Sequence, residues 1–203
     1  MGDGLTPRVL EYLERLPEGL DSYPGALVKN SVVRVWVEGH DIERLAATLP
    51  EALVPLVREE LAVSAWVPEV HAMVIYLQVR ELFFDDDDAY VRDAKERNRK
   101  LLAGPLYRMV LSLLSAERIY KTSRRVFNLM HRGTDLTVDV SRTPWVWKAK
   151  FPANLVPELM GRCYATAVIA ALELNGQRGV EAALVELTEM TLEFSVSFDR
   201  EKR

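Results

Sequence analysis

The spacing of hydrophobic residues along this 203-residue chain changes after Gly133. Beyond that point, apolar and polar side chains alternate over 136–141, 145–151 and 191–198. Because successive side chains of a strand point to opposite faces, a period of two predicts strands with one dry and one wet face. A further strand is expected around 180–187, before a tight connection to the last one.

Between these strands, residues 153–174 follow a helical period. Apolar side chains recur three and four positions apart, at Leu159, Cys163, Ala167, Ala170 and Leu174. Asn175-Gly176 then supplies residues suited to a left-handed helix end. The last seventy residues therefore predict the order strand, strand, helix, strand, strand.

The first 133 residues indicate mainly helices. We expect helices over 7–16, over 42–49 with Asp41 as N-cap, over 50–63 behind Pro50, from Pro68 to about 84, after the aspartate run 85–88, and over 106–133, as one helix or two. The segment 31–39 fits either a strand, through its β-branched residues, or a helix, like its neighbours.

This pattern predicts an α+β fold, in the wider α/β sense, with a helical layer packed on a four-stranded, mainly antiparallel sheet. Residues 1–22 are expected to form an N-terminal helix and connector, and 23–203 a single domain. The wet face of the sheet is interrupted by Val146 and alanines. We therefore expect the N-terminal helix or another subunit to cover part of it.

Composition and net charge exclude several classes of protein. Hydrophobic residues make up 49% and the formal net charge is −4, which argues against bulk nucleic-acid binding. Cys163 is the only cysteine, so an intrachain disulfide is excluded. No run resembles a signal peptide or approaches the roughly 18 apolar residues of a membrane span, so we expect a cytoplasmic protein.

The densest basic stretch holds the candidate binding residues Arg118, Lys121, Arg124 and Arg125. On a helix, positions 118, 121 and 125 share one face, which could bind an acidic protein, a phosphate or a nucleic acid. The alternative is an ordinary solvated face paired with nearby acidic residues.

Motifs for catalysis or metal binding are missing. The aspartates 85–88 lack the glycine and closing glutamate of a calcium loop, and His40, His71 and His131 have no metal-site spacing. Cys163 lies on an apolar stripe, as a core residue would. We predict no cofactor and no metal. An enzyme is the disfavoured alternative, with a site drawn from Tyr107, Glu117, Tyr120 and Tyr164.

Tyr23-Pro24-Gly25, the stretch 27–31 (LVKNS), the Trp-Val-Pro of 66–68 and the helix 159–176 carry a resemblance. In that order they resemble an uncharacterised myxobacterial domain family within the 4-vinyl reductase, haem-NO-binding-associated and TRAPP-like superfamily. The resemblance spans about 20–200 and implies the fold, dimerisation and a binding role. The chain departs from the 4-vinyl reductase type in having no cysteine at 180–198, and the resemblance implies no catalytic residue.

Two functions are therefore expected. The first is a non-enzymatic binding module, a protein-interaction adaptor or regulatory subunit that works as a homodimer or with a protein partner. The alternative is a sensor for an apolar small molecule, a lipid or a tetrapyrrole. Its cavity would lie between sheet and helices, near Trp147, Tyr164 and Phe194.

Overall fold

The computed structural model describes residues 4–58, 60–103 and 115–199, with the backbone alone at 126. We call residues 4–103 the N-terminal half; its elements are α1 (Pro7–Glu14), the 3-10 turn Gly19–Asp21, β1 (Leu27–Lys29), α2 (Asn30–Val37), α3 (Ile42–Ala46), the 3-10 turn Glu51–Leu53, α4 (Val54–Val57), β2 (Trp66–Pro68), α5 (Glu69–Phe83) and α6 (Asp87–Leu102). Residues 115–199 are the C-terminal half, with α8 (Ala116–Met130), β3 (His131–Arg132), β4 (Asp135–Asp139), β5 (Trp145–Lys150), α9 (Glu158–Leu174), β6 (Arg178–Leu187) and β7 (Thr191–Asp199).

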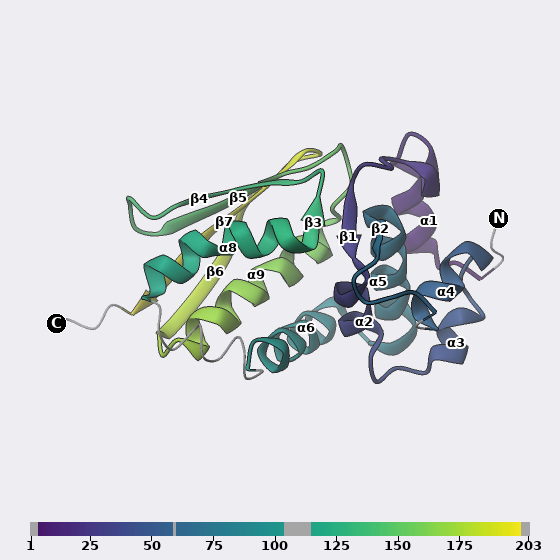
Figure 1. Cartoon of the computed structure of the whole chain (residues 1–203), viewed down its shortest axis with the longest axis horizontal. Coiled ribbons are helices and arrows are strands. Elements are labelled where there is room, and N and C mark those ends of the chain that lie inside the picture. Colours follow the sequence, from purple (N-terminus) through teal and green to yellow (C-terminus); the bar gives the residue numbers. More distant parts are fainter. Residues whose placement is uncertain (1–3, 59, 104–114, 200–203) are drawn as a thin grey trace.

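The C-terminal half confirms the predicted order of strands around one helix. Four of its strands form one antiparallel sheet, in the order β4-β5-β7-β6, and α8 and α9 cover one face of it (Figure 1). Trp147 pairs with Phe194 across β5 and β7, and both side chains point into the core. The α+β fold expected from the period of two is therefore confirmed.

The other face of this sheet carries ion pairs instead of a covering helix among the described elements. Lys148 of β5 lies 3.0 Å from Glu193 on the neighbouring strand β7 and 3.4 Å from Glu186 on β6, the next strand but one. The expectation that the N-terminal helix covers this face is wrong. That helix, α1, packs on α5 instead, with Val9 and Tyr12 buried.

A second, three-stranded sheet of order β2-β1-β3 was not predicted. Its strands have two or three residues, too few to show a period of two. Because β1 and β2 belong to the N-terminal half and β3 follows α8, this sheet joins the two halves (Figure 1). The central residues of its first two strands, Val28 of β1 and Val67 of β2, are buried.

The structure tests three expectations about helices. The ambiguous segment 31–39 is the helix α2, with Val33, Trp36 and Val37 buried. The single helix expected over 50–63 is wrong: Pro55, near the start of α4, lacks an N–H, and only a 3-10 turn and one short helix form. Of the helix expected over 106–133, the part before 115 lies outside the described residues.

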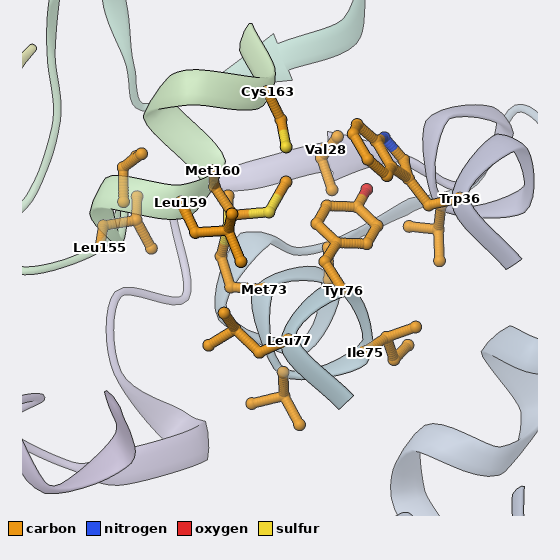
Figure 2. Close-up of a cluster of buried hydrophobic side chains, with 14 of the residues drawn as sticks. Val28, Trp36, Met73, Ile75, Tyr76, Leu77, Leu155, Leu159, Met160 and Cys163 are labelled. Atoms are coloured by element: carbon orange, nitrogen blue, oxygen red, sulfur yellow. The ribbon is translucent and has the colours of Figure 1, made fainter. Parts of the chain in front are cut away.

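One continuous core runs through both halves. Met73, Tyr76 and Leu77 of α5 face Leu159, Met160 and Cys163 of α9, with Val28 and Trp36 closing one side (Figure 2). Polar contacts reinforce the packing of α6 on α9: Lys95 pairs with Glu173 at 2.8 Å, and Asn98 Nδ2 donates to Thr166 Oγ1 at 2.9 Å. No helix in the described ranges is long and apolar enough to cross a bilayer.

Candidate ligand site at the junction of the two halves

A groove of about 740 Å³ lies where α1, the start of α9 and the β6–β7 turn meet. Its apolar lining comes from side chains that are themselves almost fully buried: Tyr12, Leu77, Val156 and Leu159. Both halves of the chain contribute to it. The volume falls within the range typical of small-molecule sites, roughly 300–1,000 Å³.

Charges of both signs form the rim of this groove. Arg8, Arg15 and Arg162 supply the cations, and the acids of the lining are Glu11, Asp87, Glu158 and Glu189. The arginines are already paired: Arg8 Nη1 lies 2.7 Å from Asp87 Oδ1, Arg15 pairs with Glu11, and Arg162 with Asp88. The rim is therefore close to neutral and offers donors and acceptors together.

The aspartate run 85–88 does more than begin a helix. Asp86 caps α6 by accepting from Ala89 N at 2.6 Å, as an N-terminal aspartate should. Asp87 bridges Arg8 of α1 and Arg80 of α5. Burial alone would raise the pKa of Asp87, but the hydrogen bonds and charges of these two arginines outweigh it and hold the pKa below its usual range. This run thus fixes one wall of the groove.

The opposite wall is the segment before α9, and side chains of the N-terminal half hold it in place. Tyr12 donates its hydroxyl to the carbonyl of Leu155 at 2.9 Å, and Tyr23 donates to that of Ala153 at 2.9 Å. Asn154 has a φ of 58° and donates its backbone N–H to the carbonyl of Glu189 at 2.6 Å. The groove is therefore preformed by hydrogen bonds between distant segments.

A buried polar cluster lies deeper in the junction. Glu69, 1% exposed, accepts from the hydroxyl of Tyr164 at 3.1 Å and contacts His131 Nδ1 at 3.0 Å. The imidazole of His131 stacks on Phe127, with ring centroids 4.2 Å apart. Because Glu69, His131 and Tyr164 belong to α5, β3 and α9, the cluster joins the two halves.

The predicted basic residues lie elsewhere, on α8. Arg118, Lys121, Arg124 and Arg125 are all exposed, and none lines the groove. Lys121 forms an ion pair with Glu117.

The residues expected around an apolar cavity lie in the core. Trp147 and Phe194 are almost fully buried, with ring centroids 5.3 Å apart. Phe127 packs its ring edge-on against Trp147 at 5.9 Å. Tyr164 belongs to the buried polar cluster instead, where its hydroxyl donates to Glu69. None of the three lines the groove.

The side chains considered for catalysis do not converge. Glu117 is exposed and paired with Lys121, whereas Tyr120 is buried against Trp145 at 5.1 Å between ring centroids. Tyr164 bonds to Glu69, and Tyr107 lies outside the described residues. Burial raises the pKa of the Cys163 thiol well above its usual range, and the charge of Arg162 offsets this only in part. This thiol packs as a core side chain.

Each histidine already has a structural contact. Arg97 Nη2 lies 3.0 Å from His40 Nε2, and the His40 ring stacks on Phe83. Burial lowers the pKa of His71, and the backbone of Leu20 and the charge of Asp21 offset this only in part. His131 bonds to Glu69. In the described part of the chain, no group of three or more His, Cys, Asp or Glu residues could hold a metal ion.

Comparison with solved structures shows which known folds this one resembles. It is similar to a Cs H-NOX variant with 4-cyano-L-phenylalanine at site 5: the TM-score is 0.52 and the identity 11%, over 85% of this chain and 97% of that chain. The fold is also similar to a single-residue variant of Tt H-NOX. The TM-score is 0.54 and the sequence identity 10%, over 85% of this chain and 95% of that chain. No family profile matches the chain. No curated protein matches it either. The fold is thus α+β and H-NOX-like.

Proposed function

We propose that this chain is a sensor-type domain that binds a small molecule in the groove between its two halves. The H-NOX-like fold favours small-molecule sensing over the protein-interaction adaptor as the main function. The observation that carries the proposal is the groove itself, which both halves build and hydrogen bonds hold open. A ligand there would contact α1, α9 and the β6–β7 turn at once.

Haem does not fit the described residues. The groove contains no histidine, cysteine or methionine, and the Tyr12 hydroxyl at its base already donates to Leu155. His131 lies deeper, but its ring is packed between Phe127 and Tyr164. The space between α5 and α9 is filled by Met73, Met160 and their neighbours (Figure 2). The ligand we propose is therefore not a haem.

The lining indicates the chemistry of the ligand. Apolar side chains form the base, while arginine and carboxylate groups alternate on the rim. An amphipathic molecule with an apolar body and polar groups of both signs, or an uncharged polar end, would satisfy both parts. A purely apolar lipid chain would leave the rim charges without new partners, and a strongly anionic ligand would meet four carboxylates.

A blocking variant tests the proposal. Glu189→Trp places bulk on the exposed rim of the groove, whereas Glu181→Trp places the same bulk on β6 outside it. We would screen amphipathic small molecules by thermal shift, since a ligand that binds only the folded state raises the Tm. Hits should stabilise the wild type and Glu181→Trp but not Glu189→Trp. Equal stabilisation of all three would refute the groove as the site.

The adaptor function and the homodimer expected from the sequence stay proposals. Sedimentation equilibrium of the purified chain would test the dimer. A single species of 23.1 kDa would contradict it.

A further inference from the structure

We propose that the outer face of α8, continued by the small three-stranded sheet, docks an acidic segment of a partner protein. We call this the α8 surface; it consists of Arg118, Lys121, Arg124, Arg125, Leu129, Arg132, Lys29, Trp66 and Val63. It shares no residue with the groove, so this inference does not depend on the proposed ligand.

Unpaired positive charge is the first observation. Arg118, Arg124 and Arg125 are exposed, and no described carboxylate forms an ion pair with any of them. Two less exposed arginines elsewhere are paired, Arg80 with Asp87 and Arg97 with Asp93. In a chain of net charge −4, such a concentration of free cations gives the α8 surface a sign opposite to that of the whole molecule.

The positive surface continues past the end of α8. This helix leads directly into β3, which pairs with β1, and β2 lies on the other side of β1 (Figure 1). The guanidinium carbon of Arg132 lies 4.1 Å from the centre of the Trp66 ring, and Lys29 Nζ lies 3.9 Å from it. Cations held against an aromatic ring lose side-chain freedom before any partner binds, which favours recognition.

An apolar contact point lies within this surface. Leu129 is 68% exposed and follows Arg125 by four positions, so the two share one face of α8. Val63, 51% exposed, flanks the small sheet, where its carbonyl accepts from Ser31 N at 2.9 Å. Exposed apolar side chains among arginines are typical of protein interfaces, where apolar contacts add affinity and charges add orientation and rate.

The dimensions favour a peptide over a phosphate backbone or a bilayer. From 118 to 129 the helix rises about 16 Å, the length of about three turns of a partner helix. Exposed Glu117 and Asp135 border the surface. These carboxylates would oppose an extended anionic surface, whereas a short acidic segment with one apolar anchor fits between them.

Fluorescence anisotropy of the full chain tests the proposal. The probe is a labelled amphipathic peptide of alternating Glu-Leu blocks, with a 20-base-pair DNA and phosphatidylserine vesicles as competitors. The charge variant is Arg118→Ser with Arg124→Ser and Arg125→Ser. The control replaces Arg92, Arg99 and Lys100, exposed cations of α6, by Ser. A third variant is Leu129→Ser.

We expect the charge variant to bind the peptide at least about tenfold more weakly and with a shallower salt dependence. The α6 control should bind like the wild type, and Leu129→Ser should weaken binding with an unchanged salt dependence. Equal affinities of the wild type and the charge variant would overturn the proposal. So would tighter binding of DNA or vesicles, or self-association through this face that the charge variant abolishes.

Discussion

Glu69 places a carboxylate, 1% exposed, at the contact between α5, β3 and α9. One of its oxygens serves both Tyr164 and His131, while the other has no partner among the described residues. A buried polar group lost from such a cluster leaves its partners unsatisfied, and this costs more than the hydrogen bond itself contributes. At the residue scale, this cluster and Asp87 provide specific polar bonding between distant segments.

Glu69→Gln should lower the free energy of unfolding by roughly 1–3 kcal/mol. The amide oxygen can still accept both contacts, but an NH2 donor without a partner replaces the second carboxylate oxygen in the buried cluster. Tyr164→Phe removes one hydrogen bond and should cost about 1 kcal/mol. Urea unfolding followed by circular dichroism measures both. Glu158→Gln, exposed at the start of α9, is the control and should change the value by less than about 0.5 kcal/mol. Equal losses in all three variants would contradict the account.

The pKa of Asp87 is lowered from its usual 3.8 in the folded state. A depressed carboxyl pKa stabilises the fold above the unfolded value, and this stabilisation disappears as the pH falls through the folded value. Asp87→Asn should therefore cost on the order of 1 kcal/mol at pH 7. The difference in free energy of unfolding between the wild type and Asp87→Asn should shrink below about pH 4.

Thermal unfolding between pH 2.5 and 7 measures this difference. Asp85→Asn is the matched control, since Asp85 is exposed in the same run. A gap between the wild type and Asp87→Asn that is constant over the whole range would show that the arginine pairing is not its cause.

Cys163 should not react in the folded protein. Its side chain is fully buried, so a reagent cannot reach the sulfur. Its pKa is raised, so the reactive thiolate form is scarce. Mass spectrometry after iodoacetamide treatment at pH 8 should detect no adduct in native buffer and one adduct in 6 M urea. Rapid labelling in native buffer would contradict the burial.

At the element scale, strands and helices with full-length patterns could be predicted from sequence. The alternation of Leu192, Phe194 and Val196 is long enough to show its period. The strands of the small sheet are too short for that, and α2 has the composition of a strand but is held as a helix by the packing of Trp36 on Tyr76 and Tyr90. Propensity is a weak indicator where tertiary contacts decide.

Local sequence patterns also fail to predict how the groove is assembled. Asp87 could be recognised as part of an acidic run, but Arg8 lies 79 positions before it in the sequence. Tyr12 and Leu155 are 143 positions apart. No local pattern predicts such pairs, so the groove could not be found from the sequence, whereas the core position of Cys163 could.

Gly133 fixes the joint between β3 and β1. Its φ is 74°, and a Cβ there would lie 2.7 Å from the carbonyl oxygen of Gly25, a backbone atom that cannot move aside cheaply. Gly133→Ala should destabilise the fold by at least about 2 kcal/mol. Gly176→Ala is the control, since its φ is 90° but nothing lies within 4 Å of the added atom. It should cost about 1 kcal/mol. Urea unfolding should separate the two, and equal losses would contradict the close approach.

At the scale of the whole molecule, the fold is H-NOX-like and side chains fill the space between α5 and α9. Met73, Leu77, Leu159 and Met160 pack together there (Figure 2). The Glu69 cluster connects α5 and α9 to β3. The groove lies beside α1. We therefore propose that this H-NOX-like fold binds a ligand in the groove beside α1 and not a haem in its core.

Titration of the purified chain with haemin, followed by the absorption spectrum near 400 nm, tests this claim most directly. We predict no saturable one-to-one spectral change, and the same behaviour for His131→Ala. A stoichiometric complex with the spectrum of a histidine-ligated haem, lost in His131→Ala but retained in His40→Ala, would contradict it.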